Sequence, residues 1–114
     1  MVMLSSFVPE RGDVIWICLN PQSGHEQSGR RPALVISPSS YNKKVGLAIV
    51  CPITTQIKGY PFEVFIPETE AIKGVILADQ VKNLDWKARK AKFVTHLPRG
   101  VIQEVLSRLN ALII

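Results

Sequence analysis

The seven residues Leu47-Ala48-Ile49-Val50-Cys51-Pro52-Ile53 form an apolar run of strand length, and this run decides the fold class of the chain. Polar and turn-forming residues bound it, with 39–46 before it and Thr54-Thr55-Gln56 after it. A short apolar run between turn signals is typical of a buried β-strand. Even the longer stretch 45–53 has only nine residues and includes a glycine and a proline. A membrane-spanning helix needs about 20 apolar residues, so we expect no membrane span.

Further runs of the same kind occur on both sides of this one, separated by turn chemistry such as Asn20-Pro21, Ser37-Pro38 and Tyr60-Pro61. The runs that we predict as strands are Val14–Leu19, Leu34–Ile36, Phe62–Ile66, Val75–Ala78 and, as a candidate last strand, Ala91–Leu97. We predict a loop over 39–46. Five or six short strands in a small chain favour a compact barrel or a sandwich.

The C-terminal end changes to a helical period. Its apolar residues recur at three- and four-residue steps, namely Val101, Ile102, Val105, Leu106, Leu109, Leu112 and Ile113. Pro98 suits the first turn of this helix, where its missing N–H costs nothing. We expect the helix to close one mouth of the barrel or to pack against its side. We expect its apolar end, 112–114, to join the core, with a subunit interface as the alternative.

Length and charge limit the classes of function. The 114 residues, 12.7 kDa, are predicted to form a single domain over 1–114. Lys and Arg number 14 against 9 Asp and Glu, which gives a net charge of +5 and suits a polyanionic partner. Between Lys82 and Arg99 the bases are Lys82, Lys87, Arg89, Lys90, Lys92 and Arg99, opposed only by Asp85. The alternative is that such lysines only keep the surface soluble and protect strand edges.

Targeting and metal signals are missing from the sequence. The first eight residues have no basic region followed by a long apolar one, so we predict a cytoplasmic protein. Cys18 and Cys51 lie in apolar runs and are predicted to be reduced, buried thiols. No spacing of cysteine and histidine resembles a zinc site, and we expect neither a metal nor another cofactor.

One predicted loop, residues 24–32, brings together His25, Glu26, Arg30 and Arg31. A guanidinium offers a planar set of donors that suits phosphate and stabilises charge developing on a phosphoryl group. Glu26 is a candidate general base, or else an ion-pair partner that orients an arginine. Pro32 restricts Arg31 to an extended backbone. A solvated loop with a surface ion pair is the alternative interpretation.

A second group follows the run 47–53. The hydroxyl of Thr54 and the ammonium of Lys58 suit a phosphate, and Thr55 and Gln56 lie between them. Thr and Gln in a turn also commonly satisfy backbone groups, which is the alternative here.

In the third predicted loop, Tyr41 and Asn42 are candidates to stack on a base or read its edge. Catalysis by Cys51 paired with a histidine lacks any local signature. A pair of histidines, His25 and His96, would suit ribonuclease chemistry, but the place of His96 at a strand-to-helix junction favours a structural role.

With these loops in view, the chain resembles the MazF/PemK (Kid) family of bacterial toxins. The resemblance covers nearly the whole chain and is carried by the blocks 11–16 (RGDVIW), 24–35 (GHEQSGRRPALV), 41–42 (YN), 52–64 (PITTQIKGYPFEV), 74–82 (GVILADQVK) and 85–89 (DWKAR). Only the first residues and the final helix match by pattern rather than by motif.

The resemblance implies an SH3-like small β-barrel, mainly β with a C-terminal helix, that forms a homodimer. It implies metal-independent, sequence-specific cleavage of single-stranded RNA, in which the ribose 2′-hydroxyl attacks its own phosphate and leaves a 2′,3′-cyclic phosphate and a 5′-hydroxyl. Arg31 matches the family's arginine, Thr54 its threonine and Glu26 its carboxylate. Arg31 is then expected to stabilise the phosphorane, Thr54 to hold the phosphate and Glu26 to act as base.

The remaining expected RNA contacts are Arg30, Lys58, Asn42, Thr55, Gln56 and His25. Some relatives carry histidine where Arg30 stands, and His25 is an addition to the commoner Gly-Ser-Glu-Gln pattern, so RNA specificity does not transfer. The expected protein partner is a cognate antitoxin whose acidic C-terminal tail lies across the basic groove. The alternative functions are a non-catalytic toxin resembling the CcdB gyrase poisons and a plain RNA-binding module.

Overall fold

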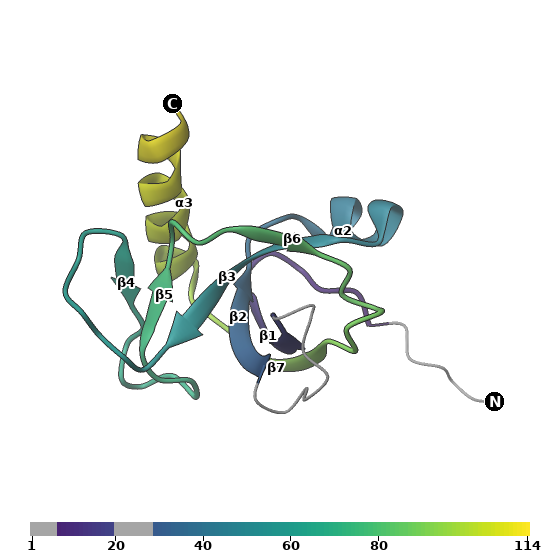
Figure 1. Cartoon of the computed structure of the whole chain (residues 1–114), viewed down its shortest axis with the longest axis horizontal. Coiled ribbons are helices and arrows are strands. Elements are labelled where there is room, and N and C mark those ends of the chain that lie inside the picture. The colour runs from purple at the N-terminus through teal and green to yellow at the C-terminus, as the bar shows by residue number, and fades with distance from the viewer. Residues whose placement is uncertain (1–6, 20–28) are drawn as a thin grey trace.

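The computed structural model describes residues 7–19 and 29–114 and places them in a curved antiparallel sheet with two helices (Figure 1). The elements are β1 Asp13–Cys18, β2 Arg30–Val35, α2 Ser39–Val45, β3 Ala48–Thr54, β4 Glu63–Phe65, β5 Val75–Leu77, β6 Lys82–Leu84, β7 Lys92–His96 and α3 Arg99–Ile113. The mainly-β fold with a C-terminal helix is therefore confirmed, and each apolar run predicted as a strand overlaps one.

The long strand β3 organises the sheet. The strand order is β4-β5-β3-β2-β1-β7, and β6 pairs with the first half of β3, where Val50 lies opposite Lys82. The second half of β3 pairs with β5 instead. Within the described residues no strand pairing joins β7 to β6 or to β4, so the barrel-like sheet is not closed by hydrogen bonds.

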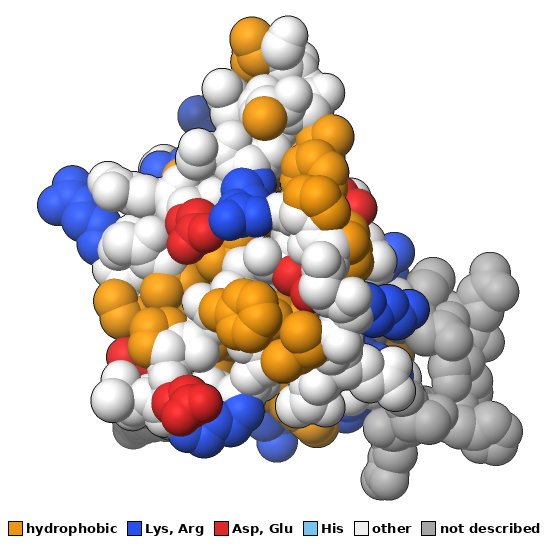
Figure 2. Space-filling model, turned by 90° about the vertical axis from the view of Figure 1, so that its left-hand side faces the viewer, with side chains coloured by type: hydrophobic (Ala, Val, Ile, Leu, Met, Phe, Trp, Pro, Cys, Tyr) orange, Lys and Arg blue, Asp and Glu red, His pale blue; other side chains and the backbone are white. Residues whose placement is uncertain are grey.

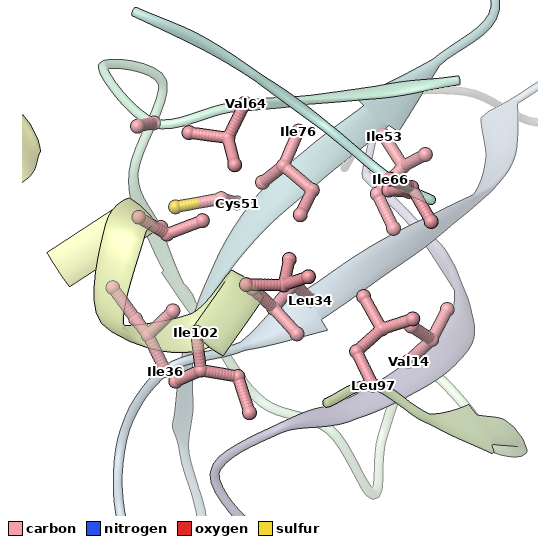
Figure 3. Packing of buried hydrophobic residues seen from close by; sticks show 13 residues of the cluster. Val14, Leu34, Ile36, Cys51, Ile53, Val64, Ile66, Ile76, Leu97 and Ile102 are labelled. Carbon is pink, nitrogen blue, oxygen red and sulfur yellow. The ribbon is translucent and has the colours of Figure 1, made fainter. Parts of the chain in front are cut away.

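Both faces of the three central strands are buried, which explains why their sequences read as continuous apolar runs. One face carries a first cluster that includes Val14, Leu34 and Cys51 and is covered by α3, β4 and β5 (Figure 3). The other face carries a second cluster that includes Ile15, Val50 and Trp86. Successive residues of a strand alternate between the two clusters.

Helix α3 is confirmed, with Pro98 at its N-cap, one position before the predicted first turn. Val101, Ile102 and Val105 are buried in the first cluster. The last residues, 112–114, are exposed, and Ile114 reaches 93% exposure. The prediction that this apolar end joins the core is therefore wrong.

Three elements differ from the sequence-based prediction. Strand β2 begins at Arg30, so Arg30, Arg31 and Pro32 lie in a strand and not in the predicted loop 24–32. The segment predicted as a loop over 39–46 contains the helix α2, which begins after Pro38 and ends at Gly46 with φ of 82°. Seven residues are too few to show a helical period, and this helix buries only Asn42. Strand β6 was not predicted, because only its last residue, Leu84, is apolar and buried.

Candidate active site

The pairing of β2 with β3 brings Arg31 and Thr54 together. Ala33 lies opposite Pro52 in this antiparallel pair, and two further steps in the same register set Arg31 opposite Thr54. Steps of two residues keep a side chain on the same face of a sheet. Arg31 and Thr54 therefore share the face of the second cluster, away from α3.

Both side chains line one cleft with a volume of about 280 Å³. The other lining residues are Leu19, Pro52, Ile53, Gln56, Lys58, Tyr60, Glu63, Leu77, Gln80 and Lys82. Three of the lining side chains are cationic. The carboxylate of Glu63 is buried and accepts hydrogen bonds from backbone N–H groups, so the cleft suits an anionic ligand.

Arg31 is exposed, and its guanidinium has no hydrogen-bond partner among residues 7–19 and 29–114. No described residue occupies its donors, so they are available to a bound phosphate. Pro32 follows it within β2, as the sequence analysis expected for an extended backbone.

Thr54 is half-buried at the end of β3. Its Oγ1 accepts a hydrogen bond from the backbone N–H of Gln56 at 3.0 Å. A hydroxyl carries one donor and two acceptor lone pairs, so the O–H of Thr54 is still able to donate to a ligand. The backbone role and the phosphate role are therefore compatible in one side chain.

The loop after Thr54 is held by a buried acid that the sequence analysis did not single out. Glu63 is 4% exposed, and its carboxylate accepts the backbone N–H groups of Lys58 at 2.9 Å and of Gly59 at 2.8 Å. Gly59 has φ of 83°, in the region that favours glycine. This anchoring fixes the loop that presents Gln56 and Lys58 to the cleft.

Tyr60 also closes the cleft on this side. Its hydroxyl donates to Oδ1 of Asp79 at 3.0 Å. Desolvation and this hydrogen bond raise the pKa of Tyr60, so its phenol stays protonated as a donor.

Two cleft residues, Gln80 and Lys82, were not predicted as site residues, and Lys82 was named only as part of the basic strip 82–99. The pairing of β6 with β3 puts Lys82 opposite Val50, on the same face as Thr54. The strip itself is divided: Lys87 Nζ lies 5.6 Å from the ring centroid of Trp86, and Arg89 Nη1 donates to the carbonyl of Cys18 at 2.8 Å. A strand predicted at 82–84 would have indicated Lys82 as a residue of the cleft.

Asn42 corrects the sequence-based prediction. It is completely buried, with Nδ2 donating to the carbonyls of Pro9 at 2.8 Å and Ser37 at 3.1 Å. Ser37 Oγ donates to its Oδ1 at 2.5 Å. Asn42 therefore holds α2 in place and is not a contact for RNA.

The other predicted contacts divide between the cleft and its surroundings. Lys58 and Gln56 line the cleft, whereas Thr55 is exposed beside it. Arg30 lies on the opposite face of β2 and donates to the carbonyls of Trp16 at 3.2 Å and Lys90 at 3.4 Å. His25 and Glu26 lie outside the described residues.

The thiol and histidine alternatives have structural explanations. Cys51 is buried in the first cluster, and burial raises its pKa to about 12, so it is not a thiolate nucleophile at neutral pH. Cys18 is half-buried. His96 Nδ1 lies 2.9 Å from Oδ1 of the buried Asp13, which supports the structural role predicted for it.

Neither a metal-binding cluster nor a membrane-spanning helix occurs in the described part of the chain. Residues 7–19 and 29–114 contain no group of three His, Cys, Asp or Glu side chains arranged to hold a metal ion. In the same residues no helix has both the length and the apolar character that crossing a membrane requires.

The chain is similar to known proteins along nearly its whole length. Residues 10–113 match the family of PemK-like, MazF-like toxins of type II toxin–antitoxin systems. The chain is 46% identical to the endoribonuclease toxin MazF of Escherichia coli K12 over 97% of its own length and 99% of the relative's. It is 32% identical to endoribonuclease PemK of Escherichia coli, covering 91% of this chain and 81% of PemK.

Solved structures agree as well. A crystal structure of MazF from Deinococcus radiodurans superposes with a TM-score of 0.87 at 46% identity, covering 95% of this chain and 98% of the other. The same species' MazE–MazF complex matches with a TM-score of 0.86 at 44% identity, covering 94% and 97%. The chain belongs to the PemK-like, MazF-like toxin family of type II toxin–antitoxin systems.

Proposed function

We propose that this toxin is a sequence-specific endoribonuclease that cuts single-stranded RNA without a metal ion and so inhibits translation and growth. The observation that carries the proposal is the cleft in which Arg31 and Thr54 lie on one sheet face with Lys58 and Lys82. Two relatives that cover most of this chain are named endoribonucleases, which supports the same activity here.

The proposed reaction is an attack within the RNA itself. The ribose 2′-oxygen bonds to the adjacent phosphorus, the bond from phosphorus to the 5′-oxygen breaks, and a 2′,3′-cyclic phosphate and a 5′-hydroxyl result. Arg31 stabilises the extra negative charge of the phosphorane, and the hydroxyl of Thr54 donates to a non-bridging oxygen. Glu26 is the proposed base that takes the 2′-hydroxyl proton, and the departing 5′-oxygen gains a proton from Arg31 or from water to become the 5′-hydroxyl.

The flanking nucleotides are held by the rest of the cleft and its surroundings. Lys58 and Lys82 are proposed to pair with neighbouring phosphates, and Gln56 with a base edge. Thr55 and Arg30, which lie outside the cleft lining, stay proposed RNA contacts, and so does His25.

We further propose that two copies of the single domain 1–114 associate. Figure 2 shows hydrophobic side chains gathered on the face over β4 and α3. The exposed large hydrophobic residues of these elements are Phe65, Leu112 and Ile113, and the exposed Ile114 follows at the C-cap of α3. A patch of this kind favours burial against a second copy.

The proposed protein partner is a cognate antitoxin. The solved complex from Deinococcus radiodurans pairs MazF with MazE, and the net charge of +5 suits an acidic tail laid over the cleft of this chain. An RNA substrate and such a partner also fit a cytoplasmic protein.

A non-catalytic toxin of the CcdB kind is the less favoured alternative. An inhibitor that only binds a protein needs no free guanidinium beside a threonine hydroxyl in a cationic cleft. The names of the relatives also favour catalysis.

The test is cleavage of a long, mixed-sequence RNA by the purified protein in EDTA, with the products sequenced and their ends analysed. We expect cuts at a short recurring sequence, each with a cyclic phosphate on one side. No cleavage, or cleavage that needs a divalent metal, would contradict the proposal.

Variants test the assignment of the site. Arg31→Ala is expected to lower kcat by at least about 100-fold, the range for removing one stabilising donor, while fold and dimer stay intact. Thr54→Val is expected to be nearly inactive and Thr54→Ser to keep activity, because serine retains the hydroxyl. Lys73→Ala is the control for removing a cation, since Lys73 donates to the carbonyl of Glu68 and is absent from the cleft lining. Normal cleavage by Arg31→Ala would show that the assignment is wrong.

A further inference from the structure

Trp16 is a large aromatic side chain on the surface of the central sheet. It is 39% exposed, whereas its neighbours Ile15 and Ile17 are fully buried. No other described aromatic ring stacks on it. Leaving an indole in water forgoes burial of a large apolar area, so its exposed face invites a ligand.

Cations surround this indole on the adjacent strands. Trp16 lies opposite Lys92 on β7 and opposite Pro32 on β2, so these side chains share one face of the sheet. Arg30 comes from the same face, with Nη2 donating to the carbonyls of Trp16 and Lys90. We call Trp16, Arg30, Lys90 and Lys92 the Trp16 surface; the three basic residues pair with no described acidic side chain.

Lys90 has an unusual backbone. Its φ is 54°, in the left-handed region that normally favours glycine, and it is the one described non-glycine residue with positive φ. This conformation lets its carbonyl accept Arg30 while its side chain is exposed. The conformation belongs to the turn before β7, in which the N–H of Lys90 donates to the carbonyl of Lys87 at 3.0 Å and that of Ala91 to the carbonyl of Trp86 at 2.9 Å.

The Trp16 surface lies on the face of the sheet opposite the cleft, and only the end of β1 separates the two along the chain. Leu19 lines the cleft, and the preceding residue, Cys18, accepts a hydrogen bond from Arg89 at 2.8 Å. Arg89 is the neighbour of Lys90 in the turn that leads to β7. An RNA strand that leaves the cleft past Leu19 would therefore reach Trp16 by passing round the end of β1, beside Arg89 and Lys90.

We propose that the Trp16 surface is a second RNA subsite, in which the indole stacks on an unpaired base a short way from the cut and the surrounding cations hold phosphates. Stacking on an aromatic ring beside basic side chains is how proteins bind single-stranded nucleic acid with little sequence preference. The inference rests on the proposed function, because the same RNA strand occupies both sites.

The charge favours RNA over a protein partner. An acidic peptide would also be attracted to Arg30, Lys90 and Lys92. Its carboxylates would bind these cations without using the exposed indole ring between them. A nucleotide supplies both groups, a flat base and a phosphate, in every repeat.

The test uses RNA substrates that contain one mapped cut site and carry zero to six extra nucleotides on the 5′ or the 3′ side. Trp16→Ala is expected to lower kcat/KM by about 5- to 100-fold for substrates extended on one side, through KM. Substrates without that extension are expected to be cut as by the wild type. Trp16→Phe, which keeps a stacking ring, is expected to restore most of the loss.

Phe93→Ala is the matched control, because Phe93 is also an exposed aromatic residue of the β1–β7 pair but lies opposite Ile15 on the other face. Its length dependence should equal that of the wild type. In a second measurement, an uncleavable 2′-O-methyl RNA should quench tryptophan fluorescence of the wild type but not of Trp16→Phe, since Trp86 is buried.

Unchanged length dependence in Trp16→Ala would overturn the subsite while leaving the proposed function intact. So would a variant that cuts every RNA normally but binds an acidic antitoxin tail less well. If the wild type cuts no RNA of any length, the failure belongs to the proposed function.

Discussion

Arg30 and Arg31 are neighbours in the chain, yet the alternation of side chains along β2 sends them to opposite faces of the sheet. Arg31 enters the cleft with no described partner, whereas Arg30 is tied to two backbone carbonyls. A one-residue shift in register would exchange the two, turning Arg31 out of the cleft and moving Arg30 away from the carbonyls that hold it. The position of Arg31 in the cleft therefore depends on the register of β2 on β3.

Cys51 gives a prediction for pH dependence at this scale. Burial holds its pKa at about 12 against an ordinary value of 9.0, so above pH 9 the unfolded chain releases a proton that the folded chain keeps. The stabilisation is complete below pH 9 and is lost as pH rises toward 12. At pH 10.5 the loss attributable to this thiol is about 2 kcal/mol.

Urea unfolding of the wild type and of Cys51→Ala at pH 8 and pH 10.5 measures this loss. The difference in free energy of unfolding between the two proteins should shrink at the higher pH, because alanine has no proton to release. If the difference does not change with pH, the pKa of Cys51 is the same in the folded and the unfolded chain, and the prediction is wrong. RNA cleavage at neutral pH should persist in Cys51→Ala.

At the scale of elements, the sequence predicts strands well where both faces are buried. The runs around Val14, Leu34 and Val50 contain almost only apolar residues, so their strand character needs no knowledge of neighbours. Helix α2 and strand β6 could not be predicted in this way, because α2 buries one residue and β6 owes its existence to pairing with β3. Lys82 was missed for the same reason.

The candidate site shows the same division. Residue types and the family resemblance were sufficient to select Arg31, Thr54, Gln56 and Lys58, all of which line the cleft. They did not reveal that the amide of Asn42 is internal, because a buried asparagine and a base-reading one look alike in a sequence. Burial depends on contacts with residues distant in the chain, such as Pro9.

Asn42 therefore gives the prediction for α2. Asn42→Ala leaves the buried carbonyls of Pro9 and Ser37 without their donor, which should lower the free energy of unfolding by about 1–3 kcal/mol. Urea denaturation measures the loss. Lys43→Ala, an exposed neighbour on the same helix, should stay within about 0.5 kcal/mol of the wild type.

Cleavage by Asn42→Ala should be normal at temperatures where the variant is folded. A variant with full stability and weaker RNA binding would instead restore the prediction that Asn42 reads a base.

At the scale of the whole molecule, net charge and local charge make separable contributions to RNA binding. The net charge of +5 attracts any polyanion from a distance, whereas Arg31, Lys58 and Lys82 are positioned to contact phosphates in the cleft. Each phosphate contact on a single strand adds about −0.7 to the slope of log K against log salt concentration. Three contacts predict a slope of about −2 from the cleft alone.

Two variants of equal charge separate these contributions. Lys82→Gln and Lys73→Gln each remove one positive charge, but Lys73 donates to the carbonyl of Glu68 on an exposed loop and is absent from the cleft lining. Titration of an uncleavable single-stranded RNA from low to physiological salt should show the slope of Lys82→Gln reduced in magnitude by about 0.7. The slope of Lys73→Gln should match that of the wild type. The two variants lose the same charge, so they differ only in whether the lost lysine contacts a phosphate in the cleft. Equal changes in both slopes would therefore mean that the overall charge, and not the cleft, holds the RNA backbone.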